Sequence, residues 1–344
     1  MTLPTRLRDA RRFIDTLDLR QIESSIAEEA RAQLIIVGPV NSGKSTLFNQ
    51  LKGKHISAVS AVPGTTREVI AEQFGPFWLI DTPGFDEMVG EGRASLALDA
   101  VQRADVAILV LDAVAGIRES DRLLYRELRA QGLPVVVVLN KVDLIRKDYK
   151  DVRRDVEAKF NAPVIPISAR QGTGIADQLI PAVIDAHPRM AVTIGRALPR
   201  FRKLAAGRII RESSALAAVI GAEPIPGLSL PFLIAVQVRM LLRLAAIFGE
   251  TMSVARAREL VSAIAGGVAI RYAAQELAKF VPGFGSVVAA LASGTGTMAL
   301  GRAAVVFFAN SQKLNAEELR SLYKRIRWRG KKTQAELIED VGQD

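Results

Sequence analysis

The sequence predicts an α/β domain with a doubly wound, mostly parallel sheet, followed by an all-α C-terminal domain. For the first domain, short apolar runs rich in β-branched residues recur between residues 33 and 190, separated by charged helical stretches. The runs are Leu34–Val37, Phe77–Ile80, Val106–Leu111, Val135–Leu139 and Val164–Ile167. For the second domain, the apolar stretches beyond residue 228 lengthen to helix size.

Composition and charge limit the compartment and the partners. The 344-residue chain contains no cysteine, which fits a reducing compartment such as the cytoplasm. Residues 1–195 contain 25 basic and 25 acidic side chains, and residues 196–344 contain the other 21 basic and 11 acidic ones. The net charge of +10 therefore lies in the second half. Such an asymmetry indicates an anionic partner there, either a lipid surface or nucleic acid.

Five segments are expected along the chain. They are an N-terminal amphipathic helix in residues 1–32, the α/β domain in 33–190, a basic linker in 191–227, a helical domain in 228–327 and a polar tail in 328–344. We expect the N-terminal helix to pack on the domain that follows it, because its apolar residues recur at helical spacing. A membrane-surface or partner helix is the alternative.

A glycine-bounded loop follows the first apolar run and precedes a helix pattern. It reads Gly38-Pro39-Val40-Asn41-Ser42-Gly43-Lys44-Ser45-Thr46. The glycines let consecutive N–H groups point inward around an anion, and the helix start turns its positive dipole end toward the same point. Lys44 adds a cation for the outer phosphates of a nucleoside triphosphate, and the Ser45 hydroxyl can ligate Mg²⁺. The expected phosphate contacts are Gly38, Asn41, Ser42, Gly43, Lys44, Ser45 and Thr46.

Two further loops supply candidates for the metal and the terminal phosphate. Val62-Pro63-Gly64-Thr65-Thr66-Arg67-Glu68 places threonines in a loop of the kind that closes over a γ-phosphate and its metal. The run Trp78-Leu79-Ile80-Asp81-Thr82-Pro83-Gly84 ends a strand in an acid and a turn. We expect Asp81 to hold Mg²⁺ indirectly and the Gly84 N–H to meet the γ-phosphate.

The last two apolar runs end in candidates for the base. Val135–Leu139 leads into Asn140-Lys141-Val142-Asp143. The Asp143 carboxylate can accept hydrogen bonds from the N1 and N2 amines of guanine, a pair that adenine does not offer. Val164–Ile167 leads into Ser168 and Ala169, where a backbone N–H can meet the guanine carbonyl.

These motifs, in this order and at strand ends, resemble the G domain of translation-factor-class GTPases over about residues 33–187. The segments Pro63–Arg67, Asp81–Gly84 and Ile167–Gly174 most resemble its Era/TrmE-like branch. The resemblance implies a P-loop G domain that binds GTP and GDP with Mg²⁺ and hydrolyses GTP, with Lys44, Thr66 and Gly84 as catalytic residues. It implies that Thr66, rather than Thr65, is the switch threonine that ligates Mg²⁺. A homodimer through the G domain and an unidentified protein partner are further expectations.

Two positions bear on the hydrolysis rate. Phe85 stands where Ras-like GTPases place a glutamine that orients the attacking water, so we expect that intrinsic hydrolysis is slow or that another group replaces the glutamine. In the Era/TrmE-like branch an asparagine at the place of Asn41 can help to ligate K⁺. Two alternatives follow for Asn41: it ligates K⁺ and hydrolysis is stimulated by that ion, or it only shapes the loop.

The apolar stretch Val281–Gly301 has two interpretations. Its length and lack of charge allow a membrane-embedded hairpin, whereas its many small residues and Gly294-x-Gly296 favour a close-packed hairpin in a soluble or peripheral helical bundle. If the stretch is helical, Gly285, Ala289, Ser293, Thr297 and Gly301 form a ridge that lets another helix approach closely. Arg239 and Arg243 interrupt Leu228–Phe248 and favour an amphipathic helix there.

The second half resembles the helical domain of unknown function in bacterial YcjF-like proteins. The segments that carry this resemblance are Gln237–Leu241, Val281–Ser286 and Ala299–Ala304. The resemblance implies a membrane-associated helical module without known chemistry. We expect the protein in the cytoplasm, with the alternatives that it is peripheral to the inner membrane or embedded in it from the cytoplasmic side. The leading hypothesis is thus a GTPase whose nucleotide state regulates this module. The alternatives are a ribosome- or RNA-associated assembly GTPase that uses the basic second half, and a scaffold with incidental hydrolysis. The RNA alternative is disfavoured because the second half lacks the compact α/β RNA-binding pattern of Era.

Overall fold

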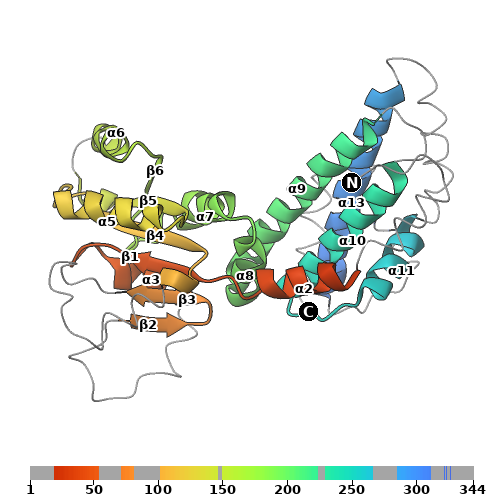
Figure 1. Cartoon of the computed structure of the whole chain (residues 1–344), viewed down its shortest axis with the longest axis horizontal. Coiled ribbons are helices and arrows are strands. Elements are labelled where there is room, and N and C mark those ends of the chain that lie inside the picture. Colours follow the sequence, from red (N-terminus) through yellow and green to blue (C-terminus); the bar gives the residue numbers. More distant parts are fainter. Residues whose placement is uncertain are drawn as a thin grey trace. The chain divides into compact units, whose positions relative to one another are not determined.

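The structure is a computed structural model that confirms both predicted fold classes (Figure 1). It describes residues 19–53, 71–80, 101–145, 149–223, 229–265 and 285–310, together with residues 321, 323 and 326. The chain divides into two compact units. One, the α/β unit, spans Arg31–Phe201, and the other, the helical unit, combines Met1–Ala30 with Arg202–Asp344.

The α/β unit contains a six-stranded sheet of order β2-β3-β1-β4-β5-β6. The strands are β1 (Leu34–Val37), β2 (Ala71–Phe74), β3 (Phe77–Ile80), β4 (Val106–Asp112), β5 (Val135–Asn140) and β6 (Val164–Pro166). All five predicted apolar runs are strands, and their pairings with one another are all parallel. The edge strand β2 pairs antiparallel with β3 and was not predicted. Because the strands of the parallel part run in one direction, the loops after β1, β4, β5 and β6 gather at one edge of the sheet.

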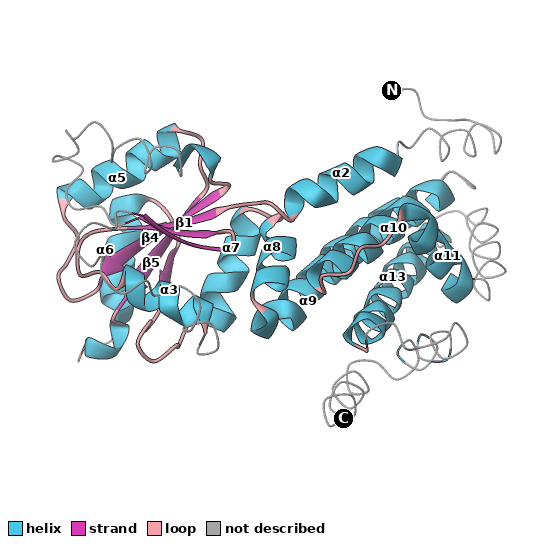
Figure 2. Ribbon diagram, turned by 90° about the horizontal axis from the view of Figure 1, so that it is seen from below, coloured by secondary structure: helices cyan, strands magenta, loops and turns pink. Residues whose placement is uncertain are grey.

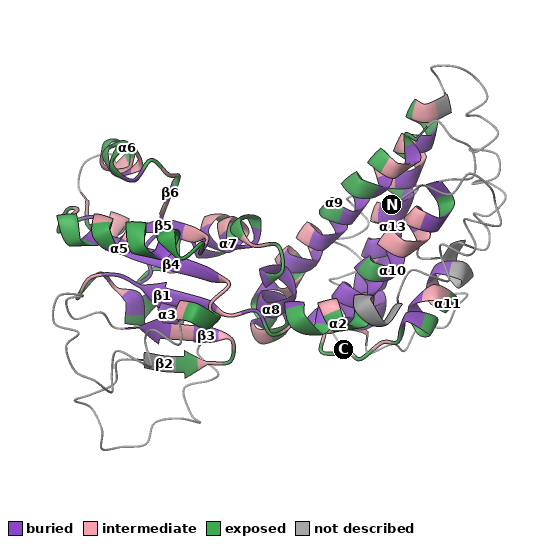
Figure 3. Cartoon of the chain, viewed as in Figure 1, coloured by how far each residue is buried: buried purple, intermediate pink, exposed green. Residues whose placement is uncertain are grey.

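Helices cover both faces of this sheet; α5 and α3 lie on opposite sides of the strands in Figure 2. The regular elements are α3 (Lys44–Lys52), α5 (Glu119–Ala130), α6 (Tyr149–Phe160), α7 (Ile180–Ala186) and α8 (Met190–Ala197), with short turns η2 (Val142–Leu144), η3 (Ile175–Leu179) and η4 (Pro199–Phe201). On one face, Leu124 and Phe160 from α5 and α6 pack against strand residues such as Leu109. Burial on both faces explains why the strands read as continuous apolar runs (Figure 3).

The helical unit is a bundle whose described helices pack through small residues. They are α2 (Leu19–Glu29), α9 (Arg202–Gly221), α10 (Ser229–Ile247), α11 (Val254–Ala265) and α13 (Gly285–Ala309). A Cβ atom added to Gly221 of α9 would lie 2.8 Å from the Ala289 carbonyl oxygen of α13. A Cβ on Gly301 would lie 2.6 Å from Ile210. Ala289, Ser293 and Gly301 of the predicted ridge therefore lie where α9 approaches α13, and α13 continues as one helix through Gly294 and Gly296.

The structure corrects two expectations about the domains. The predicted basic linker in residues 191–227 contains α8 and the 20-residue helix α9. Its basic residues misled the prediction, because they lie on a helix whose buried side is formed by small and apolar residues such as Ala205 and Ile209. The N-terminal segment was expected to pack on the domain that follows, but α2 packs on α10 in the helical unit.

Two described helices are long and apolar enough to cross a membrane by length and composition alone. They are α10 and residues 286–309 of α13. In their most apolar windows, 61% and 72% of the residues are buried inside the protein. Core helices of a soluble bundle have the same properties, so both predicted alternatives for this region stay open.

Candidate functional site

The loop between β1 and α3 requires glycine at both ends. Gly38 has φ 144°, and a Cβ atom there would lie 2.2 Å from the Val110 carbonyl oxygen of β4. Gly43 has φ 92°, and a Cβ there would lie 2.2 Å from Nδ2 of Asn140. Neither position accepts a side chain without displacing its neighbour. The loop is thereby held against the ends of β4 and β5.

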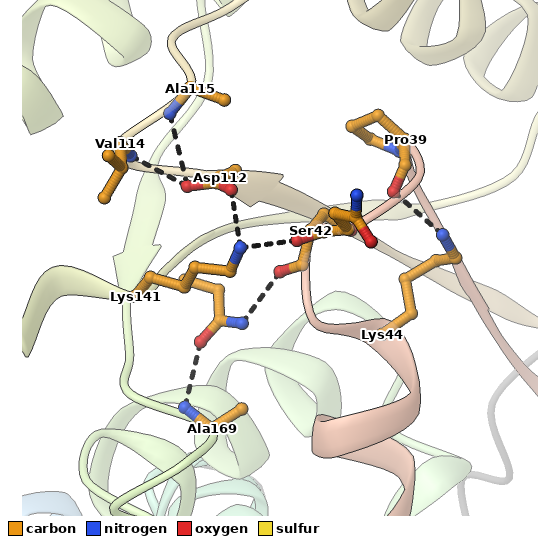
Figure 4. Close-up of polar contacts among 10 residues, drawn as sticks. Pro39, Ser42, Lys44, Asp112, Val114, Ala115, Lys141 and Ala169 are labelled. Atoms are coloured by element: carbon orange, nitrogen blue, oxygen red, sulfur yellow. Dashed lines mark hydrogen bonds and ion pairs between the residues drawn. The ribbon is translucent and has the colours of Figure 1, made fainter. Parts of the chain in front are cut away.

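Lys44 and Ser42 bring polar groups into this loop. Lys44 begins α3, is only 4% exposed, and donates a hydrogen bond from Nζ to the Pro39 carbonyl oxygen at 2.8 Å (Figure 4). The Ser42 hydroxyl is buried and has no hydrogen-bond partner among the described residues. Ser45 and Thr46 lie exposed in the first turn of α3. The loop thus offers a cation, an unpaired hydroxyl and a helix N-terminus, the groups that suit a phosphate chain with its Mg²⁺.

Asn140 joins three loops at the edge of the sheet. Its side chain is 2% exposed and donates from Nδ2 to the Ser42 carbonyl oxygen at 2.8 Å. Its Oδ1 accepts a hydrogen bond from the Ala169 N–H at 2.9 Å (Figure 4). One buried amide therefore fixes the phosphate loop, the end of β5 and the loop after β6 relative to one another.

Lys141 is held across the phosphate loop by a residue that the sequence reasoning missed. Its Nζ donates to Oδ2 of Asp112 at 2.7 Å and to the Asn41 carbonyl oxygen at 2.5 Å. Asp112 ends β4 directly beside Asn140 in the sheet register and accepts hydrogen bonds from the Val114 and Ala115 N–H groups. Burial raises the pKa of Asp112, but the hydrogen bonds from Lys141 and the two amides together have the larger, opposite effect. The pKa of Asp112 therefore lies below its ordinary value of 3.8. The sequence does contain a signal for Asp112, because it directly follows an apolar run, as Asp81 does.

The loop after β6 is folded tightly enough to present backbone groups. Ser168 is fully buried, its N–H donates to the Thr173 carbonyl oxygen at 3.1 Å, and its Oγ accepts from the Gln171 N–H at 3.2 Å. Gly174 has φ 77°, and a Cβ there would lie 2.4 Å from the Pro166 carbonyl oxygen. Asp143 lies exposed in the short turn η2, three residues after Asn140, to which this loop is bonded through Ala169.

The structure brings together most of the predicted site residues at the carboxyl edge of the sheet. These are Gly38, Asn41, Ser42, Gly43, Lys44, Ser45, Thr46, Asn140, Lys141, Asp143, Ser168 and Ala169. Thr66, Asp81, Gly84 and Phe85 lie outside the described residues. In the described ranges, no cluster of three or more histidine or acidic side chains could hold a metal by itself.

Comparisons with known proteins assign this part of the chain to a class. Residues 33–141 match the family model described as "50S ribosome-binding GTPase". GTPase Der from Acidithiobacillus ferrooxidans is 39% identical over 177 residues, which cover 46% of this chain and 39% of that protein. GTPase Der from Kosmotoga olearia is 33% identical over 169 residues, which cover 44% and 38%. The matched residues therefore carry a P-loop GTPase domain.

These matches cover only part of the proteins compared. The chain spans about two fifths of the length of the curated GTPase Der relatives. A crystal structure of Aquifex aeolicus Era bound to GDP.AlF4- shares 25% identity, covering 54% of this chain and 67% of that chain, with a TM-score of 0.36. These three matches cover between 44% and 54% of this chain.

Proposed function

We propose that the α/β unit binds GTP and GDP with Mg²⁺ and hydrolyses GTP to GDP and phosphate. The observation that carries this proposal is the buried Asn140 side chain, which ties the phosphate loop to the loop after β6. The two bonds of Asn140 support the proposal because they join the loops proposed to contact phosphate and guanine at the edge of the sheet where ligands of such sheets bind.

The roles follow from the position of each group. Lys44 and the N–H groups of the loop stabilise the negative charge that develops as water attacks the γ-phosphate in line. The Ser45 hydroxyl would hold Mg²⁺ together with Thr66 and, indirectly, Asp81, and the metal supplies further positive charge. The Gly84 N–H would contact the γ-phosphate. Phe85 cannot orient the attacking water, so the intrinsic rate should be slow.

Competition between nucleotides tests the proposal directly. The Asp143 carboxylate is exposed next to the site and suits the two donors of guanine, which adenine does not offer. A fluorescent GDP analogue bound to the full chain with MgCl₂ should be displaced by GTP and GDP, but not by ATP at a thousandfold or so higher concentration. Equal displacement by ATP and GTP would remove the guanine assignment.

Asp112 is expected to act as a positioning residue for Lys141. Asp112→Asn keeps the size of the side chain but removes the charge that holds Nζ at 2.7 Å, so GDP affinity should fall by about tenfold. Because the pKa of Asp112 is lowered, its charged pairing should be complete above pH of about 4 and lost as the pH falls further. Isothermal titration calorimetry measures the affinity.

The control for Asp112 is Asp151→Asn. The Asp151 side chain is 86% exposed and lies 3.6 Å from Arg154, so its charge should contribute little. The positioning role is contradicted if both variants bind GDP as the unchanged protein does.

The finer proposal for Asn41 is that K⁺ stimulates hydrolysis. Asn41 has φ 64°, a left-handed conformation that asparagine tolerates well, and this geometry equally supports a loop-shaping role. We expect faster GTP hydrolysis in KCl than in NaCl of equal concentration, with the difference lost in Asn41→Ala. Equal rates in the two salts would leave Asn41 with the loop-shaping role alone.

We further propose that the nucleotide state controls binding of the helical unit to an anionic membrane surface on the cytoplasmic side. The basic excess of residues 196–344 and the apolar helices α10 and α13 support a lipid partner. The matched family description favours a second candidate, an RNA- or ribosome-associated role. Sedimentation of GTP- and GDP-loaded protein with anionic vesicles or with ribosomal particles separates the two. Lipid binding that does not differ between the nucleotides would contradict the regulation.

A further inference from the structure

Contacts between three helices fix their relative register. The Gln237 side chain of α10 donates a hydrogen bond from Nε2 to Oγ1 of Thr297 in α13 at 3.1 Å. A Cβ atom on Gly301 of α13 would meet both Ile210 of α9 and Met240 of α10. Because Gly221 of α9 meets residues near the start of α13, α9 runs antiparallel to α13, and α10 runs parallel to it.

In this register, the charged residues that border the uncharged part of each helix lie at the same height along the bundle. Along α9 the last charged residues are Arg211 and Glu212, along α10 the first is Arg239, and along α13 the first is Arg302. All of them lie within two residues of the contact between Ile210, Gly301 and Met240. Beyond that level, the helices carry no charge. We call residues 213–221, 229–238 and 285–301 the uncharged end; it lies where α9 ends and α13 begins in Figure 1.

Side chains in the uncharged end are arranged opposite to those of a protein surface in water. Six of its polar residues point inward: Ser213, Ser214, Ser229, Gln237, Ser293 and Thr297 are each at most 8% exposed. Ser286 is half-buried. Its exposed residues include large apolar ones: Leu216, Val219, Leu230, Val287, Val288 and Leu291, each between 38% and 70% exposed. The exposed Thr295 bonds its hydroxyl back to the Leu291 carbonyl oxygen at 2.7 Å, which satisfies the donor without water.

In α9 and α10, the length of this end matches half of a bilayer. About ten uncharged residues of each helix extend about 15 Å at 1.5 Å per residue, and the hydrocarbon core of a bilayer is about 30 Å thick. The uncharged residues 285–301 of α13 extend about 25 Å, so α13 is longer at this end than its two neighbours. We propose that the uncharged end enters one leaflet of a membrane, with Arg211, Arg239 and Arg302 at the level of anionic headgroups. This inference rests on the lipid role proposed above and names the surface that performs it.

A lipid is the occupant that the charges favour. Apolar side chains surrounded by uncharged residues on three helices, with arginines at their border, complement acyl chains beneath anionic headgroups. Glu223 lies exposed two residues after the end of α9 and adjoins the uncharged end. Its charge opposes insertion, so Glu223→Gln should raise lipid affinity.

Vesicle binding by surface variants tests the assignment. With vesicles of phosphatidylglycerol and phosphatidylethanolamine, Val219→Asp and Leu291→Asp should each lower the partition coefficient of the full chain by about tenfold or more. Leu123→Asp in α5 is the matched control, because Leu123 is also an exposed leucine, at 48%, and lies in the α/β unit.

In Leu291→Trp, lipids brominated on the acyl chain should quench the fluorescence added by the new indole.

The possible outcomes distinguish failure of lipid binding as a whole from failure of the assignment of lipid binding to this surface. If the unchanged protein binds no vesicles, the lipid role and this surface both fail, while nucleotide competition still reports on the GTPase proposal. If the unchanged protein binds but Val219→Asp and Leu291→Asp bind equally well, only the surface assignment fails. If sedimentation velocity without lipid finds a dimer that these substitutions dissociate, a second copy covers the uncharged end and the lipid assignment is overturned.

Discussion

Asp143→Asn is expected to change the nucleotide preference from GTP to xanthosine triphosphate. The Asp143 carboxylate would accept hydrogen bonds from the N1–H and the amine of guanine. An asparagine amide replaces one of these acceptor oxygens by an NH₂ donor, which faces the guanine amine unfavourably. Xanthine carries a carbonyl oxygen in place of that amine and accepts the new donor. Because an unpaired polar group in a nucleotide site is costly, GTP affinity should fall by about a thousandfold.

Displacement of labelled nucleotide by GTP and by xanthosine triphosphate measures this change. Asp143 lies exposed in the turn η2, so the substitution should leave the fold intact. The Asp143 side chain also takes no part in the hydrogen bonds that join Asn140 to Ser42 and Ala169. Asp151→Asn in α6 serves as the control and should retain the preference for GTP. An Asp143→Asn protein that still binds GTP at full affinity would show that the base lies elsewhere.

The strands and the motif loops could be predicted because their signals are local. A run such as Val135–Leu139 is buried on both faces of a parallel sheet, so its composition alone indicates its position. Gly38 and Gly43 report backbone conformations and close approaches that only glycine permits. Asp112 was missed because its role depends on a partner 29 residues away, and an acid after a strand has many uses.

The organisation of the helical unit could not be predicted, because its contacts join distant segments. The basic residues of α9 suggested a linker, whereas the packing of α9 depends on small residues of α13 about 70 to 90 residues later. The position of α2 depends on an ion pair between Glu29 and Arg243, which lie 214 residues apart. No pattern within either helix indicates that pairing.

That ion pair is the basis of the largest expected effect on stability. Glu29 of α2 is 2% exposed and accepts hydrogen bonds from Nε of Arg243 at 2.7 Å and from Arg239 at 2.9 Å. Arg243 is 3% exposed and also donates to Glu212 at 3.1 Å. Nearby, Glu23 accepts the N–H of Val254 at the start of α11. These contacts attach the N-terminal helix to the two helices α10 and α11.

Glu29→Ala should therefore lower the free energy of unfolding of the helical unit by about 3–5 kcal/mol, because it leaves the buried Arg243 without its principal counter-charge. Glu259→Ala in α11 is the matched control: its pair with Arg256 is 3.6 Å long with both side chains at least 60% exposed, so the loss should be under about 1 kcal/mol. Urea unfolding followed by far-ultraviolet circular dichroism measures both. Equal losses in the two variants would mean that α2 does not hold the bundle together. A selective loss at Glu29 would establish that the helical unit needs a segment from before the α/β unit, so the GTPase domain is inserted between two parts of one folding unit.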